Sequence, residues 1–239
     1  MKFIRYIYEG PIIQNVDIAK LATSINSDCK AACAEIRAAR KLLYRGIKYD
    51  EELWSKEKTR MNRMPKDTSR ALHEVLDKSF QKKFGWRARS QGLICSNSGL
   101  SANDYGHIRV IFPIGKYKAL WRPGTEDIMD VFPWWFDDAA NGFLRAVDLY
   151  NRQSFHVEKF GKIDTNQDTE KQMEQLQNIM HKLIDMKLNK FKYTSLKEPL
   201  SQDWPIEIML NCKSYYSVST QRRDFIQALT KHLDIQVSN

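Results

Sequence analysis

The chain has 239 residues, a hydrophobic content of 42% and a formal net charge of +9. Its length and apolar content suffice for a substantial core, and we expect a single domain over residues 1–239. No run reaches the roughly 18 apolar residues of a membrane-spanning helix, and the first residues lack the apolar stretch of a secretion signal. These features argue against a membrane partner and favour a soluble protein made in a cytoplasm.

The first part of the chain has the pattern of an amphipathic helix. From Asp17 to about Leu43, apolar residues recur every three or four positions, which predicts one buried helical face and an N-terminal helical part over residues 1–42. The compact apolar run over residues 42–47 breaks this pattern and predicts a buried strand. Cys29 and Cys33 lie on the helical stripe without a second cysteine pair, so we expect buried free thiols.

The middle of the chain alternates between helices and short strands. A second helix is expected from Asp67 or Thr68, either of which would cap it, to Gly85. Prolines and glycines then separate three predicted strands, which are residues 92–96, 107–112 and 117–121. Residues 132–150 predict a short helix with an aromatic cluster. We expect this cluster to pack in the core, because the neighbouring aspartates would repel a phosphate backbone.

The last third of the chain predicts a further amphipathic helix over residues 168–191. Residues 206–211 and 214–218 follow as a strand pair or one bent strand. Thr220 is the expected cap of a final helix over residues 221–239, which leaves residues 43–220 as the core. Because the helices and strands do not alternate regularly, the sequence predicts an α+β fold with a largely antiparallel sheet.

The net charge does not identify a partner, and the absence of two common motifs argues against two classes of enzyme. A net charge of +9 attracts polyanions, but acidic residues are interspersed with the basic ones almost everywhere, which equally suits a soluble surface. The basic segment 60–68 precedes a predicted helix start and is either an anion site or a solvated loop. The chain lacks a glycine-rich phosphate loop and a Gly-x-Ser-x-Gly elbow, which argues against a phosphoryl-transfer enzyme and against a serine or cysteine hydrolase.

Three polar residues lie at the edges of apolar strand-like runs. Arg45 needs an anionic partner if it is buried, either a ligand or a carboxylate at the edge of the core, and Gly46 leaves room for a ligand near the backbone. Ser96 and Ser98 place hydroxyls where a strand ends, which suits a ribose or an ordinary turn. Glu207 is the catalytic candidate, because a carboxylate stabilises a cationic sugar; otherwise it faces solvent on an edge strand.

In this order, these residues resemble the Arg, Ser-x-Ser and Glu motifs of mono-ADP-ribosyltransferases. The resemblance implies two small antiparallel sheets around an NAD cleft, with helices at their flanks. NAD would be the substrate, and no metal would be required. Arg45 would contact the NAD phosphate and ribose, and the backbone of Gly46 would bond the nicotinamide amide. Ser96, Ser98 and a stacking Tyr105 would frame the cofactor, and Glu207 would catalyse release of nicotinamide.

Two positions depart from that family pattern. Asn97 stands where a threonine is usual, and Pro205 stands where arginine-modifying members carry another glutamate. The acceptor of ADP-ribose is therefore open, and it could be a protein, a nucleic acid or water. The small size of the chain and the absence of a secretion signal resemble those of a bacteriophage protein, which would place it in the host cytoplasm, with a host protein as a partner, or in a virion.

Two functions without catalysis compete with this interpretation. A basic surface of this kind could bind nucleic acid, which would show as a steep salt dependence of binding. A virion component could keep a transferase-like fold and act through assembly contacts alone, because a fold does not determine a function.

Overall fold

The computed structural model describes residues 17–50, 52–64 and 68–236. The strands are β1 (Tyr44–Ile47), β2 (Trp54–Lys58), β3 (Leu93–Ser96), β4 (His107–Pro113), β5 (Tyr117–Trp121), β6 (Lys192–Thr194), β7 (Glu207–Cys212) and β8 (Ser214–Ser219). The helices are α1 (Ile18–Asp28), α2 (Lys30–Ala39), α3 (Arg70–Phe84), α4 (Ala88–Gln91), α5 (Gly99–Asn103), η1 (Ile128–Val131), α6 (Phe136–Ala140), α7 (Arg145–Asn151), α8 (Ser154–Phe160), α9 (Thr169–Leu188), α10 (Lys197–Leu200) and α11 (Arg223–His232).

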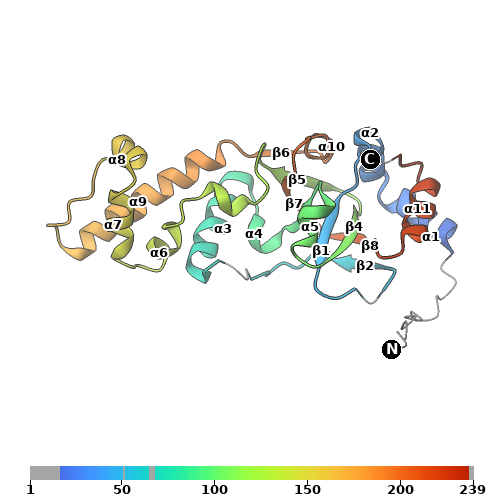
Figure 1. Cartoon of the computed structure of the whole chain (residues 1–239), viewed down its shortest axis with the longest axis horizontal. Coiled ribbons are helices and arrows are strands. Elements are labelled where there is room, and N and C mark those ends of the chain that lie inside the picture. The colour runs from blue at the N-terminus through green and yellow to red at the C-terminus, as the bar shows by residue number, and fades with distance from the viewer. Residues whose placement is uncertain (1–16, 51, 65–67, 237–239) are drawn as a thin grey trace, which may run out of the picture.

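The molecule is elongated, with its sheet towards one end and a helical lobe at the other (Figure 1). Helices α1, α2 and α11 cover the sheet end, and α3 and α6 to α9 form the helical lobe. Each part has its own apolar core. One core surrounds Ile25, Ile111 and Leu210, and the other surrounds Phe80, Trp135 and Ile184. The prediction of an α+β fold is confirmed.

The strands form one eight-stranded antiparallel sheet in the order β2-β8-β4-β1-β3-β7-β5-β6, so the expected two small sheets are not what the structure shows. The sheet is continuous because β1 and β3 meet at its centre, although only Tyr44 and Ser96 pair there. Every other neighbouring pair of strands is joined by three or more residue pairs. The centre is therefore its most weakly paired point.

Strands β7 and β8 behave as one bent strand, which was one of the two predicted alternatives. They do not pair with each other, because β7 lies between β3 and β5 while β8 lies between β4 and β2. Only Lys213 separates the two strands in the sequence. The chain therefore passes from one half of the sheet to the other at this residue, and Glu207 begins the strand on the β3 side.

The predicted first helix is two helices, because Cys29 adopts a non-helical conformation with φ −113° and ψ 29°. The break lets the two helices pack on different neighbours, α1 on α11 and α2 on α10. All four cysteines of the chain are buried and free, which confirms the prediction for Cys29 and Cys33.

Two predicted helix caps are wrong. Ser69 caps α3 by accepting a hydrogen bond from the Leu72 amide at 3.2 Å, so Thr68 does not cap it, and Asp67 lies outside the described residues. Gly85 ends α3 as predicted, with a left-handed φ of 81°. Thr220 does not cap α11, because its hydroxyl donates to the Ile108 carbonyl at 2.8 Å and extends the contact of β8 with β4.

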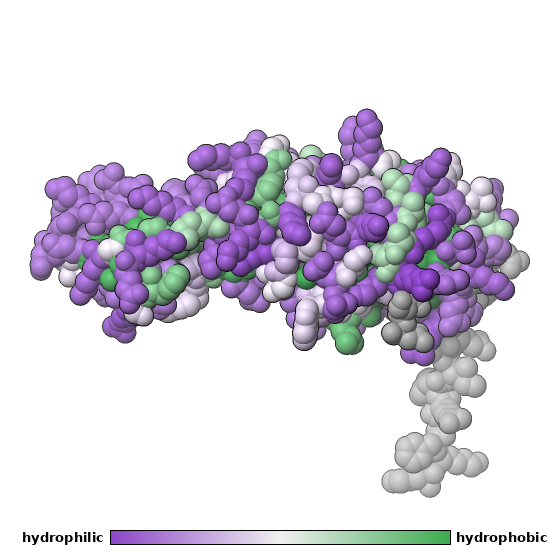
Figure 2. Space-filling model, turned by 90° about the horizontal axis from the view of Figure 1, so that it is seen from above, coloured by the Kyte–Doolittle hydropathy of each residue, from purple (hydrophilic) through white to green (hydrophobic). Residues whose placement is uncertain are grey.

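The aromatic segment 132–150 contains α6 and α7 instead of one short helix. Trp135 and Phe136 are fully buried, which confirms core packing for these two residues. Trp134, by contrast, leaves 64% of its surface exposed. The face of the molecule in Figure 2 is largely hydrophilic, with apolar residues in patches between the polar ones. Among the helices of the described residues, none has both the length and the apolar content needed to cross a bilayer.

Strand β2 was not predicted from the sequence. It pairs with β8 at one edge of the sheet and carries Lys56, Glu57 and Lys58. Charged side chains are common on edge strands, where they discourage pairing with other chains. The strand therefore lacks the apolar alternation by which a half-buried strand is recognised.

Candidate functional site

The three sequence motifs meet at the centre of the sheet. Arg45 lies on β1, Ser96 on β3 and Glu207 on β7, and these three strands are neighbours (Figure 1). Ser96 is directly opposite both Tyr44 of β1 and Glu207 of β7. Residues that are separated by more than 100 positions in the sequence are thus adjacent where β1 and β3 diverge.

Glu207 is buried and its carboxylate is only half satisfied. Only 6% of the Glu207 surface is exposed, and its Oε2 accepts a hydrogen bond from the Ile128 amide at 3.0 Å. The other oxygen, Oε1, is buried and has no hydrogen-bond partner among the described residues. A buried acceptor without a partner is costly, which makes this oxygen a ready contact for a hydroxyl donor.

Burial raises the pKa of Glu207 to about 7, and the nearby carboxylate of Asp127 acts in the same direction. The Ile128 amide and the guanidinium groups of Arg89 and Arg63 partly offset this rise in pKa. Glu207 therefore changes its charge near neutral pH instead of in the acidic range. A carboxyl group perturbed in this way is a recognised feature of catalytic sites, although buried structural groups also show it.

Arg45 extends its guanidinium across the gap between β1 and β3. Its Nη1 donates to the Ile94 carbonyl at 2.9 Å, and its Nε is buried without a hydrogen-bond partner. Among the described residues, no carboxylate forms an ion pair with Arg45. The structure therefore does not support the alternative in which a carboxylate at the edge of the core is the partner of Arg45. The side chain retains an unused donor beside the candidate site.

The arginine opposite Arg45 on the next strand makes an informative contrast. Arg109 of β4 is directly opposite Arg45 and forms a buried ion pair with Asp50. It also donates to the carbonyls of Glu52 at 2.9 Å and Ser217 at 2.8 Å. Arg109 therefore has the partners of a structural arginine, whereas Arg45 lacks a charged one.

The two serines of the motif have different environments. The Ser96 hydroxyl accepts a hydrogen bond from the Ser98 amide at 3.1 Å and lies on the residue opposite Glu207. The Ser98 hydroxyl caps α5 by accepting from the Ser101 amide at 3.4 Å. Ser96 is thus closer to the candidate chemistry, while Ser98 shapes the turn that follows β3.

Asn97 holds the loop that leads into β7. Its side-chain amide donates to the carbonyls of Gln202 at 3.1 Å and Trp204 at 3.0 Å, and its side-chain oxygen accepts from the Ile206 amide at 2.9 Å. A threonine side chain could not make this set of contacts, because it has one donor and no amide. The departure from the usual motif therefore has a structural role, which is to position the residue before Glu207.

Gly46 and Tyr105 are in direct contact. A Cβ added to Gly46 would lie 2.0 Å from the Ala102 carbonyl oxygen and 2.8 Å from the Tyr105 Cβ. The space beside Gly46 is thus filled by α5 and the residues that follow it, so the expectation that Gly46 leaves room for a ligand near the backbone is wrong. Burial raises the pKa of Tyr105 to about 12, with further contributions from Asp127 and Glu207, although the residue remains 58% exposed.

Two further arginines, Arg63 and Arg89, lie near Glu207. The sequence indicated Arg63 only as part of the basic segment 60–68. Arg63 donates its backbone amide to the Ser90 carbonyl at 3.0 Å, while its Nη1 is buried without a partner. Burial and the charges of Arg45 and Arg89 lower the pKa of Arg63, whereas Glu207 and Tyr105 raise it. Arg63 therefore lies among the cations, the carboxylate and the phenol of the site. Lys66, in the same segment, lies outside the described residues.

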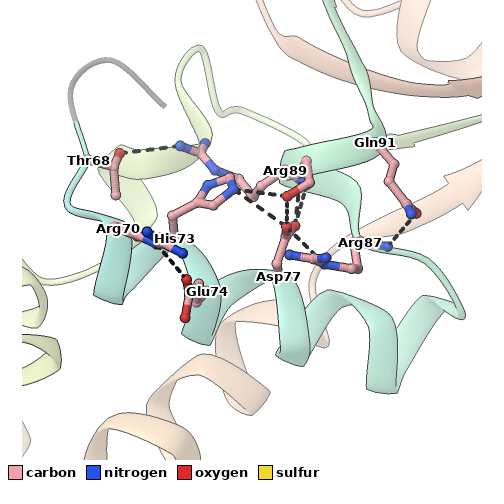
Figure 3. A network of polar contacts seen from close by, with 9 residues as sticks. Thr68, Arg70, His73, Glu74, Asp77, Arg87, Arg89 and Gln91 are labelled. Carbon is pink, nitrogen blue, oxygen red and sulfur yellow. Dashed lines mark hydrogen bonds and ion pairs between the residues drawn. The ribbon is translucent and has the colours of Figure 1, made fainter. Parts of the chain in front are cut away.

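Arg89 is held in place by a buried aspartate (Figure 3). Asp77 of α3 is fully buried and accepts hydrogen bonds from the backbone amides of Arg89 at 2.8 Å and Ser90 at 3.1 Å. The Ser90 hydroxyl also bonds Asp77 and contacts His73 Nε2 at 3.0 Å. This network fixes α4 against α3, which orients the Arg89 guanidinium towards Thr68. No sequence motif indicated Arg89 or this network.

The candidate site is adjacent to a cavity but does not line it. A cavity of about 620 Å³ contains Met129 and Asp130 of η1 in its wall, and the preceding residue, Ile128, donates its amide to Glu207. Arg45, Ser96 and Glu207 are not among the residues that line this cavity. The segment that contains η1 thus separates the two features.

The donor set at the site is that of an anion or sugar site. Within the part of the chain that the structure describes, no group of three or more His, Cys, Asp or Glu side chains is arranged to hold a metal ion. Comparison of the chain with protein-family models, with curated proteins and with solved structures finds no match.

Proposed function

We propose that the protein cleaves the bond between nicotinamide and ribose in NAD and transfers ADP-ribose to an acceptor. One observation supports this proposal. Glu207, a buried carboxylate with an unpartnered oxygen, lies beside Ser96 at the centre of the sheet, with Arg45 on the next strand. This is the arrangement that the resemblance to mono-ADP-ribosyltransferases requires, and it arises from three segments that are far apart in the sequence.

In the proposed reaction, the bond between the nicotinamide nitrogen and the ribose carbon breaks, and both electrons leave with nicotinamide. The ribose carbon and ring oxygen then share a positive charge. Ionised Glu207 would stabilise this charge while Oε1 accepts a hydrogen bond from a ribose hydroxyl. The acceptor supplies the electron pair of the new bond to the ribose carbon, and its proton passes to solvent. With water as the acceptor, the products are ADP-ribose, nicotinamide and a proton.

The guanidinium groups around Glu207 suit the diphosphate of NAD. Arg45 Nε and Arg63 Nη1 are both buried donors without partners, and Arg89 is close enough to lower the pKa of Arg63. Planar guanidinium donors match phosphate oxygens in geometry and charge. Because like charges repel, an anionic ligand among these arginines would relieve the repulsion between them as well as forming new hydrogen bonds.

The Ser96 hydroxyl would orient Glu207 or bind the ribose without adding charge, since Ser96 lies directly opposite that residue. Tyr105, which is partly exposed and lies near Glu207, would supply an aromatic face for the nicotinamide ring. We further propose that the halves of the sheet on either side of the β1–β3 junction correspond to the two small sheets of the transferases. The acceptor, whether protein, nucleic acid or water, is set by surfaces outside these residues.

The test is nicotinamide release from NAD by the purified protein, with and without a cell extract as a source of acceptor. We expect release by the wild type and a loss of about a hundredfold or more in Glu207→Gln, the scale reported for removing one group that stabilises a transition state. Glu170→Gln is the matched control, because Glu170 is an exposed glutamate in the first turn of α9. Label transferred from NAD into macromolecules would separate transfer from hydrolysis.

Two results would contradict the proposal. One is the absence of nicotinamide release by folded wild-type protein in every extract. The other is an activity of Glu207→Gln within about twofold of the wild type, since a residue that stabilises the transition state must lower the rate when it is lost. Salt-dependent nucleic-acid binding together with no NAD consumption would instead favour the non-enzymatic role of the basic surface.

A further inference from the structure

A second carboxylate, that of Asp127, is held beside Glu207 by the segment over residues 125–129. The Glu207 amide donates to the Thr125 carbonyl at 3.2 Å, and the Ile128 amide donates to Glu207 Oε2 at 3.0 Å. Asp127 lies between these two contacts in the chain, where consecutive Cα atoms are only about 3.8 Å apart. The backbone of Asp127 therefore passes close to Glu207, although the two residues are far apart in the sequence.

The Asp127 side chain folds back onto the start of η1. Its Oδ1 accepts a hydrogen bond from the Met129 amide at 2.7 Å, and the adjacent amide, that of Ile128, is the one that bonds Glu207. Two neighbouring backbone amides thus each hold a different carboxylate. Because adjacent backbone nitrogens in a helical turn are about 3 Å apart, the two bonded carboxylate oxygens lie within about 9 Å of each other.

Each of these carboxylates keeps one oxygen free. Among the described residues, nothing donates a hydrogen bond to Glu207 Oε1 or Asp127 Oδ2, and no cation forms an ion pair with Asp127. Burial is the main cause of the raised pKa of Glu207 and of Tyr105, and the Asp127 carboxylate adds to both shifts. The adjacent Glu126, by contrast, is exposed and accepts a hydrogen bond from the Ser101 hydroxyl. Asp127 is therefore the acidic residue of this segment that is available beside Glu207.

Two carboxylates in this arrangement can divide the chemistry of a sugar transfer. In one class of glycoside hydrolysis, the two carboxyl groups are about 6.5–9.5 Å apart, and one of them removes a proton from the attacking water. Nicotinamide takes both electrons of the broken bond and leaves NAD as a neutral molecule, so its departure needs no acid. The second carboxylate is therefore free to act as a base.

The strand that carries Glu207 cannot supply this base. The two residues before Glu207 are Pro205 and Ile206, whose side chains take up no proton. A base also indicates the kind of acceptor. A hydroxyl group is a weak nucleophile unless its proton is removed as it attacks, whereas an acceptor that is already an anion needs no base.

We propose, on the basis of the proposed NAD reaction, that Asp127 is the base of the transfer step and that the acceptor is a hydroxyl group of a macromolecule or of water. The acceptor oxygen forms the new bond to the ribose carbon with a lone pair, and its proton passes to Asp127 Oδ2 and then to solvent. The bond to nicotinamide breaks, and both of its electrons leave with nicotinamide. Glu207 stabilises the sugar cation while this exchange takes place.

The test compares two acceptors for NAD, which are water, with a proton to lose, and the azide anion, with none. ADP-ribose and ADP-ribosyl azide are measured for the full-length wild type and for Asp127→Asn, together with label transferred into macromolecules of a cell extract. We expect Asp127→Asn to lower hydrolysis and transfer about a hundredfold or more, the scale of general base catalysis. Its formation of ADP-ribosyl azide should stay within about twofold of the wild type.

Three control variants make the result specific. Asp130→Asn removes an exposed aspartate of the same η1 segment and should leave both reactions unchanged. Asp127→Glu keeps a carboxylate and should restore part of the hydrolysis that Asp127→Asn loses. Glu207→Gln should lose the reactions with water and with azide alike. Asparagine keeps an oxygen that can accept from the Met129 amide, so we expect an unaltered unfolding transition for Asp127→Asn.

Three outcomes would overturn this inference, and they differ from one another. Hydrolysis and transfer by Asp127→Asn within about twofold of the wild type would exclude Asp127 as the base and leave the NAD reaction standing. An equal loss of the water and azide reactions in Asp127→Asn would show that the residue only shapes the surroundings of Glu207. No NAD turnover by the wild type with water, azide or extract would overturn the NAD reaction itself, before any variant is compared.

Discussion

Replacing Glu207 by glutamine should remove the loss of stability that this residue causes as pH rises, and should lower the proposed activity about a hundredfold or more. Burial raises the pKa of Glu207 from its ordinary 4.5 to about 7 in the folded protein. Between these two pH values, the unfolded chain releases a proton that the folded protein retains. Ionisation of Glu207 thus favours unfolding, so its contribution lowers the stability as pH rises through this window and levels off above about pH 7.

The size of this effect follows from the two pKa values. A difference between 4.5 and about 7 corresponds to about 3 kcal/mol of unfolding free energy that is present below pH 4.5 and lost above pH 7. Glutamine does not titrate, so Glu207→Gln removes this pH dependence. In the variant, a buried amide nitrogen without a partner can replace Oε1, which lowers the unfolding free energy by the same amount at every pH. The quantity to measure is therefore the change with pH in the difference in unfolding free energy between the variant and the wild type.

The assay is urea denaturation of both proteins at pH 4 and pH 8, with the unfolding free energy obtained from each transition. We expect the difference between Glu207→Gln and the wild type to move by about 3 kcal/mol in favour of the variant between the two pH values. The activity of the wild type should rise with pH through about 7, because the ionised carboxylate is the active form. A stability difference that does not change with pH would refute the reasoning that burial sets the charge of Glu207.

Other predictions concern the residues that shape the site. Asn97→Ala should lower the unfolding free energy by about 2 kcal/mol, because it leaves the Ile206 amide and loop carbonyls without partners, and proteolysis of the loop over residues 199–206 should become faster. Gly46→Ala should cost about 1–3 kcal/mol in thermal unfolding, because its Cβ would lie 2.0 Å from the Ala102 oxygen; a neutral effect would show that the loop yields freely. Asp77→Ala should cost about 3 kcal/mol and weaken NAD turnover, because it unties α4; unchanged stability in denaturant would contradict the role of this network.

Much of the fold follows from local patterns in the sequence. The three-and-four spacing of apolar residues predicted α9, and the apolar runs between glycines and prolines predicted β3, β4 and β5. These features depend on which face of an element is apolar, and that information is local. The candidate site residues likewise follow from residue types at strand edges, where a charge is unusual. Strand β2 was missed because its side chains are charged and it lies at an edge.

Local patterns did not reveal how the candidate site is completed. Arg63 and Arg89 surround Glu207 only because α4 is anchored on the buried Asp77, a contact between residues that no periodic pattern links. The role of Asn97 depends on a loop more than 100 residues away in the sequence. Such contacts are set by chain reversals and packing, so the sequence alone predicts either a ribose contact or an ordinary turn at the serines and does not reveal that Asn97 bonds the loop before β7.

By itself, the sequence determined an α+β chain with a basic surface and three polar residues on strands. Only the tertiary structure decided that Arg45, Ser96 and Glu207 share neighbouring strands, that Glu207 is buried and that its carboxylate meets the Ile128 amide. The physical reason is that residue type sets what chemistry a side chain offers, whereas its pKa and partners depend on burial and on neighbours brought together by folding. Bending of β7 into β8 at Lys213 and the narrow junction of β1 with β3 create that environment.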